Sequence, residues 1–159
     1  REYIDKDVTY FTEDFGLIDW DKYLDTKDTF IFFDDHQNAY TRLQQMKWMG
    51  FFQAMFEDNY PEKQGDCYSL KKIFAESGFE GKNIIPPNAA HVNYVKRNIE
   101  TYTTLPPLFK PEMTRWGDKW DNINYPTQEA ILIKDKIEKY PIIKEEAGAY
   151  TWICYVKLK

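Results

Sequence analysis

Several residue types that define whole classes of protein are scarce in this 159-residue sequence. Its two cysteines, Cys67 and Cys154, have no C-x-x-C spacing, which argues against a disulfide framework and a structural zinc site. No apolar run approaches the roughly 20 residues that cross a bilayer, and no signal-peptide pattern is visible. Lys and Arg form no block, and the net charge is −5, so the clustered positive charge that a nucleic-acid backbone requires is missing. These absences predict a soluble, cytoplasmic protein that binds neither nucleic acid nor a membrane.

Aromatic residues, by contrast, make up 18% of the chain. The simpler interpretation is that the rings fill the core of a small domain, and the alternative is a stacking surface for a planar or sugar ligand. The length suits one domain. Because the sequence begins at Arg1 within what reads as an element, without an initiator Met, we expect a single domain over 1–159 that lacks its N-terminal part.

The clearest pattern in the sequence is a strand, a helix and a second strand. Thr29–Phe33 is a continuous apolar run, which is typical of a strand covered on both faces. From 38 to 49 the apolar residues recur with helical spacing, with Arg42 outside the apolar stripe, and Gly50 supplies a C-terminal stop. Phe51–Phe56 is the second apolar strand. We therefore predict a right-handed βαβ unit with two parallel strands.

Weaker patterns predict the remaining elements. Between 83 and 125, repeated prolines predict an extended, proline- and aromatic-rich excursion packed on the domain. The fold that we predict is α/β: a partial Rossmann-like three-layer sandwich with a mainly parallel sheet. The other expected elements are helices at 69–77, 89–100 and 127–139 and a last strand at 150–158.

Both strands of the βαβ unit end on acidic residues. Asp34 and Asp35 follow the first strand, and Glu57 and Asp58 follow the second. Parallel neighbours end at one edge of a sheet, so four carboxylates would converge there and repel each other unless protons or a cation neutralise them. Magnesium, calcium or manganese would fit these oxygen ligands, and an imidazole from His36 would shift the preference towards manganese or iron. The alternative is that the acids cap the following helix or face solvent.

The segment FIFFDDHQNAYTRLQQMKWMGFFQAMFEDNYP, about a fifth of the chain, resembles a known family. It is similar to the fourth strand, helix and fifth strand of class I S-adenosylmethionine-dependent methyltransferases, in the cephalosporin hydroxylase-like and sugar O-methyltransferase branch. The resemblance implies that Asp34, Glu57 and Asp58 hold magnesium beside the methyl donor, with Asp35 and His36 as less firmly matched neighbours. The last predicted strand resembles the family's terminal strand. The family's glycine-rich donor loop has no counterpart among the seven glycines, so no donor-binding residue is assigned.

The resemblance leads us to predict methyl transfer from S-adenosylmethionine to a hydroxyl of a small molecule or sugar. The cation would bind the acceptor oxygens, lower the hydroxyl pKa and orient it for in-line attack. His36 or Asp35 would accept the proton, and Asn59 and Tyr60 would line the acceptor pocket. A homo-oligomer is left open.

Two other functions stay open from the sequence. The same segment also resembles the fourth motif of haloacid dehalogenase-like phosphatases, in which paired acids bind magnesium. Their D-x-D nucleophile would correspond to residues 5–7, although no apolar strand precedes them here. A non-catalytic interaction module is the third reading, with Trp116, Trp120 and Tyr125 as its partner surface. Both enzyme readings predict a hard cation at Asp34 and Asp35.

Overall fold

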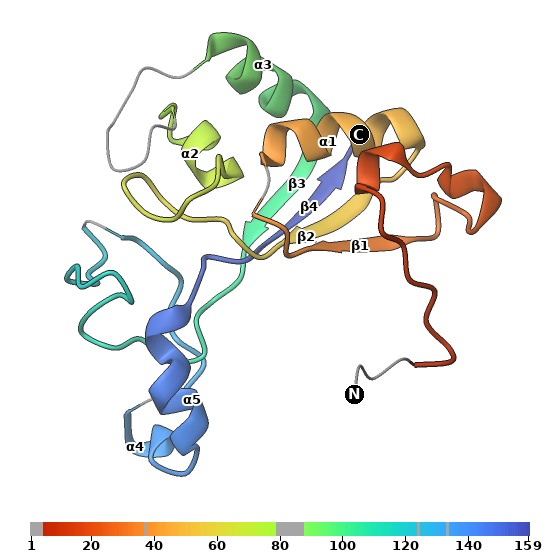
Figure 1. Ribbon diagram of the computed structural model, residues 1–159. Helices are drawn as coiled ribbons and strands as arrows, with labels where there is room; N and C mark the ends of the chain where they lie inside the picture. The colour runs from red at the N-terminus through yellow and green to blue at the C-terminus, as the bar shows by residue number, and fades with distance from the viewer. Residues whose placement is uncertain (1–4, 37, 79–87, 124, 133) are drawn as a thin grey trace.

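The computed structural model describes residues 5–36, 38–78, 88–123, 125–132 and 134–159. Within these ranges the chain is mixed α/β, with an open four-stranded sheet (Figure 1). The strands are β1 (Phe30–Phe33), β2 (Gln53–Phe56), β3 (Ile99–Thr104) and β4 (Cys154–Leu158). The helices are α1 (Ala39–Met49), α2 (Leu70–Phe74), α3 (Ala89–Asn98), α4 (Lys134–Ile137) and α5 (Pro141–Glu146). Short 3₁₀ turns are η1 (Phe15–Leu17), η2 (Trp20–Lys22) and η3 (Ala147–Ala149).

The sheet has the strand order β1-β2-β4-β3. The predicted parallel pair joined by a helix is confirmed, because β1 and β2 run parallel with Phe33 opposite Phe56. The expectation of a mainly parallel sheet is corrected: β4 pairs antiparallel with both β2 and β3, so the sheet is mixed. The last strand enters from the opposite direction and fills the space between β2 and β3, which satisfies the backbone groups along both of its sides.

Helix α1 follows from local sequence signals. The Asn38 side chain accepts hydrogen bonds from the backbone N–H groups of Tyr40 and Thr41, as an N-cap does. Gly50 ends the helix with a left-handed φ of 82°, a conformation that disfavours residues with a side chain. Between these two ends, Leu43 and Met46 are fully buried against the sheet. The helix therefore positions the short loop that precedes it, which carries the first acidic pair.

Helices α1, α2 and α3 all lie on one face of the sheet (Figure 1). The residues of β1, β2 and β4 that point to this face join them in a single apolar core. On the opposite face, Phe30 is 50% exposed and Phe32 is 53% exposed. The expectation that Thr29–Phe33 is covered on both faces is therefore wrong for the described residues, which form two layers. The run is apolar on both sides, and periodicity alone does not reveal that one side lacks a covering layer.

The predicted excursion contains a strand that its prolines concealed. The β-prone residues of β3 pair with β4 inside the region expected to be irregular, while 83–87 lie outside the described residues. Beyond β3, Trp120 and Trp152 are buried in a second aromatic cluster with Tyr60 and Cys67. Aromatic residues thus contribute to both cores, as the simpler interpretation predicted, whereas others, among them Trp48 and Trp116, are exposed. Among the described residues, no helix combines the length and apolar character that a membrane crossing requires.

Both cysteines are buried and carry free thiols. Burial raises the pKa of each thiol to about 12. Because the thiolate is the reactive form, we expect the folded chain to react with Ellman's reagent at mildly alkaline pH at least about 100-fold more slowly than the chain unfolded in urea. The measurement is the absorbance of released thionitrobenzoate. Rapid reaction of one equivalent in the folded chain would contradict this arrangement.

Candidate metal centre

The carboxyl ends of β1 and β2 lie side by side at one edge of the sheet. Their register pairs Phe33 with Phe56, and the backbone N–H of Glu57 donates to Phe33 O at 2.9 Å, so the ladder continues to the acidic residues. The amino end of β4 lies at the same edge, because Cys154 pairs with Phe56. The predicted convergence of the two acidic strand ends is thus confirmed at the level of the backbone. It places Asp34 and Asp58 on neighbouring strands.

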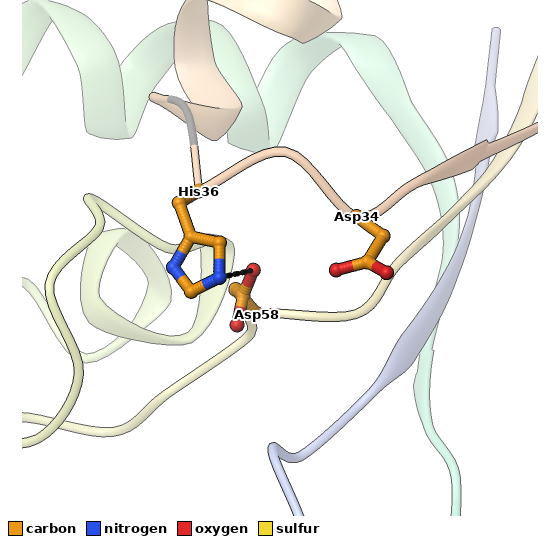
Figure 2. A group of neighbouring side chains, drawn as sticks. All are labelled: Asp34, His36 and Asp58. Atoms are coloured by element: carbon orange, nitrogen blue, oxygen red, sulfur yellow. Dashed lines mark ion pairs between the residues drawn. The ribbon is translucent and has the colours of Figure 1, made fainter. Parts of the chain in front are cut away.

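Three side chains gather at this edge and offer ligand atoms within 4.8 Å of one another: Asp34, His36 and Asp58 (Figure 2). Asp34 and Asp58 come from the two strand ends, and His36 comes from the loop that leads into α1. Asp34 and His36 are exposed, whereas Asp58 retains only 9% of its surface. Two carboxylates and one imidazole are a donor set that suits manganese or iron(II).

Asp58 is the member of this group whose environment most needs an explanation. Its Oδ2 atom is buried and accepts no hydrogen bond from the described residues. The nearest cationic group is His36, whose Nε2 lies 3.5 Å from Asp58 Oδ2. A buried carboxylate oxygen that lacks a hydrogen-bond donor is costly, and a bound cation would offset that cost. The buried Asp58 oxygen is therefore the feature of this group that a cation would satisfy.

The orientation of His36 is set by a residue that the sequence did not indicate. His36 Nδ1 lies 2.9 Å from Asp66 Oδ1, in the loop after β2. This hydrogen bond and the charge of Asp58 raise the pKa of His36 above its usual value. A carboxylate on one imidazole nitrogen commonly holds the other nitrogen towards a metal. His36 also has a φ of 50°, a left-handed conformation that residues with side chains adopt mainly where the surroundings enforce it.

Glu57 lies next to the three-residue group and interacts with the charges of Asp58 and Asp34. Its Oε1 accepts a hydrogen bond of 2.7 Å from Thr151 Oγ1. Burial, the hydrogen bond to Asp58 and the charges of Asp58 and Asp34 raise the pKa of Glu57 to about 7. Three crowded carboxylates thus disfavour full ionisation when only protons are present to neutralise them. Glu57 was predicted as a ligand; the structure places it beside the three-residue group and bonded to Thr151.

Asp35 faces a different partner from the one that sequence analysis expected. Its carboxylate pairs with Arg42, with Arg42 Nη2 at 2.7 Å and Nε at 2.8 Å from Asp35 Oδ2. Arg42 also binds Asp14 and is buried, whereas the helical pattern had placed it outside the apolar stripe. The structure therefore does not bring Asp35 into the group with His36. Asp35 and Arg42 are seven residues apart, on either side of the start of α1. This spacing does not predict a contact, because the two side chains meet only through the conformation of the loop before the helix.

Asn59 and Tyr60, the expected lining of the acceptor pocket, are buried in structural contacts. The Asn59 amide nitrogen donates to Tyr102 Oη and Trp152 O, both at 2.9 Å, and its Oδ1 accepts from the Lys71 backbone N–H. Tyr60 retains 2% of its surface, and burial raises its pKa to about 12. Asn59 thus anchors the chain after β2 to β3, to α2 and to Trp152 just before β4, and Tyr60 packs in the aromatic cluster that contains Trp152. In this conformation they hold the loop that carries Asp66 in place.

Comparison of the chain with protein-family models, with curated proteins and with solved structures finds no match. Its function must therefore follow from the site. Asp34, His36 and Asp58 form the group of His, Cys, Asp and Glu side chains that fits a metal ion within the described ranges. Residues 5–7, the D-x-D of the phosphatase reading, are not part of this group. The three side chains can hold a divalent cation at the edge where the sheet presents its strand ends.

Proposed function

We propose that Asp34, His36 and Asp58 bind a divalent cation and that the chain uses it in the transfer of a methyl group from S-adenosylmethionine to a hydroxyl. The observation that carries the first part is the buried Asp58 Oδ2, which accepts no hydrogen bond from any described residue and faces His36. Manganese suits the donor set best, and magnesium is the ion that the family resemblance implies. When bound, the cation would polarise the acceptor hydroxyl and lower its pKa.

The arrangement of the sheet supports the second part. The acidic residues stand at the ends of the parallel pair, where open α/β sheets take up ligands. The last strand, compared above with the terminal strand of the methyltransferase family, lies beside β2 in the same sheet. We propose that this sheet belongs to a Rossmann-like three-layer sandwich whose cation side is carried by the described residues. Its acceptor is a small molecule, and a sugar is the acceptor that the resemblance suggests.

The phosphatase reading receives no comparable support. Asp5 and Asp7 are engaged with each other, because the Asp7 backbone N–H donates to Asp5 Oδ1 at 2.9 Å. They belong to a turn at the N-terminal end of the described residues. The interaction reading also weakens, because Trp120 is buried and Tyr125 is half-buried against Trp152. Methyl transfer is therefore the function that we propose.

A manganese titration with two neighbouring variants tests the cation site. We expect the intact chain to bind one Mn²⁺ and Asp34→Asn to bind it about tenfold or more weakly, because the variant removes one of two carboxylate ligands. The matched control is Asp35→Asn, which removes the same charge one residue away. Asp35 pairs with Arg42 instead of facing the three-residue group, so the Mn²⁺ affinity of this variant is expected to change less than about twofold. Calorimetry or the electron paramagnetic resonance signal of free Mn²⁺ gives the affinities.

Two results of this titration would count against the proposal. If Asp34→Asn binds Mn²⁺ like the unchanged chain, or if both variants weaken binding equally, the three-residue group is not the site. The donor is tested on the same samples by the shift of the melting temperature with S-adenosylmethionine. No shift together with intact Mn²⁺ binding would restrict the function to cation binding and remove methyl transfer.

A further inference from the structure

A cavity of about 310 Å³ lies at the same edge of the sheet as the candidate metal centre. It is lined by residues of α5 and η3, of the chain after β3 and of the segment that leads into β4, and these parts of the chain meet below the strand ends in Figure 1. Leu108 is 51% exposed and Ile142 is 76% exposed, although both are apolar. Exposed apolar side chains around a concave site are typical of a binding pocket. The apolar lining is formed by Leu108, Phe109, Ile142, Ile143, Ala149 and Ile153.

The polar groups of this cavity are few, and most already have partners. The Tyr150 hydroxyl donates to Leu105 O, and the Thr151 hydroxyl donates to Glu57 Oε1. The Glu57 carboxylate can accept further hydrogen bonds, because each oxygen has two lone pairs. Glu146 lies at the exposed rim. A sugar would leave most of its hydroxyls without a partner here, which is costly, whereas an apolar body with one hydroxyl fits this wall.

Glu57 connects the cavity to the cation group. It lines the cavity, directly precedes Asp58 in the sequence, and interacts electrostatically with both Asp58 and Asp34. A hydroxyl that donates to Glu57 is therefore held next to the group that would take the cation. The volume agrees with a single ring, since a cavity of about 150 Å³ is enough for benzene and about twice that adds room for a substituent.

We propose that this cavity binds the acceptor and that the acceptor is an apolar, ring-sized molecule with one hydroxyl at Glu57, a phenol rather than a sugar. In naming the acceptor, this inference rests on the methyl transfer proposed above. The binding itself requires neither cation nor methyl donor. It follows from the shape of the cavity, the apolar wall and the acceptor capacity that the Glu57 carboxylate has to spare beside Thr151.

The test is a titration of the intact chain with three probes, without metal or donor. We expect 4-ethylphenol to bind with a dissociation constant on the order of 1 mM, and 4-ethylanisole, whose methyl ether cannot donate, about tenfold more weakly. Methyl α-glucopyranoside is expected to show no binding. Methyl signals of Leu108, Ile142 and Ile143 in the NMR spectrum should shift with the phenol. This mapping uses the unchanged chain, so it does not depend on the folding of any variant.

A pair of matched variants locates the site. Ala149→Phe fills the cavity and is expected to weaken 4-ethylphenol binding about tenfold or more, whereas Ala90→Phe, at an exposed position of α3, leaves it unchanged. Equal binding of phenol and glucoside, shifts confined to other methyl groups, or unchanged affinity in Ala149→Phe would overturn the inference. Phenol binding by a chain that takes up no Mn²⁺ would overturn the proposed function and leave the cavity assignment intact. Mn²⁺ binding without phenol binding would overturn the cavity assignment and leave the proposed function intact.

Discussion

Asp58→Asn is expected to weaken Mn²⁺ binding about 100-fold and, at the same time, to stabilise the metal-free chain by about 1 kcal/mol. The two effects have one cause. The Asp58 carboxylate is buried beside Glu57 and Asp34, and its Oδ2 accepts no hydrogen bond from the described residues. Asparagine keeps the shape of the side chain and removes the buried charge. The variant therefore loses the central ligand and relieves the repulsion between the carboxylates.

The measurements are a Mn²⁺ titration and urea unfolding with and without the metal. In the unchanged chain, saturating Mn²⁺ should raise the midpoint of unfolding, because the metal binds the folded state alone. In Asp58→Asn that rise should be absent. Asp35→Asn again serves as the control for the lost charge, and it should keep the metal-dependent rise. A destabilised metal-free Asp58→Asn would mean that the carboxylate is well satisfied in the native chain, and the argument for a cation at this site would fail.

Arg42→Met is expected to lower the free energy of unfolding by about 3 kcal/mol. The Arg42 guanidinium is buried and joins the residue before η1 to the loop before α1. Its Nη2 atom lies 2.7 Å from both Asp14 Oδ2 and Asp35 Oδ2. The guanidinium also lies over the rings of Phe15 and Phe33, at 5.8 Å and 5.7 Å from their centroids. Methionine keeps much of the apolar packing but leaves both carboxylates without this partner. Arg97→Met, at an exposed position of α3, should change stability by less than about 0.5 kcal/mol.

Part of the effect of Arg42→Met should depend on pH. The hydrogen bonds from Arg42 and from the Gly16 backbone lower the pKa of Asp14 from 3.8 to about 2. A lowered carboxyl pKa stabilises the fold above the unfolded value, and this contribution disappears as the pH falls through the folded value. The stability difference between the unchanged chain and Arg42→Met should therefore shrink between pH 3.8 and about 2. Urea titrations across this range measure it, and a constant difference would assign the effect to packing alone.

The parallel pair and its connecting helix could be predicted because their signals are local. Asn38 and Gly50 cap α1 through contacts with the next few residues, and the acids stand directly after the apolar runs. Strand β3 was missed because the surrounding prolines outweighed its short β-prone run. Its place in the sheet comes from pairing with β4, about fifty residues later. The uncovered face of β1 could not be predicted, because the sequence pattern of an apolar strand is the same whether one or both of its faces are covered.

The amino-acid sequence by itself determined that Asp34 and Asp58 stand at the ends of two neighbouring parallel strands, because strand direction and helix length follow from short-range patterns. Only the tertiary structure decided which acids lie close together with His36 in the proposed cation site. The choice depends on partners that lie close in space. Asp35 forms an ion pair with Arg42, and one oxygen of Glu57 accepts a hydrogen bond from Thr151. Asp66 contacts Nδ1 of His36, whose other ring nitrogen faces Asp58. Such contacts arise when loops pack, and neither composition nor spacing encodes them.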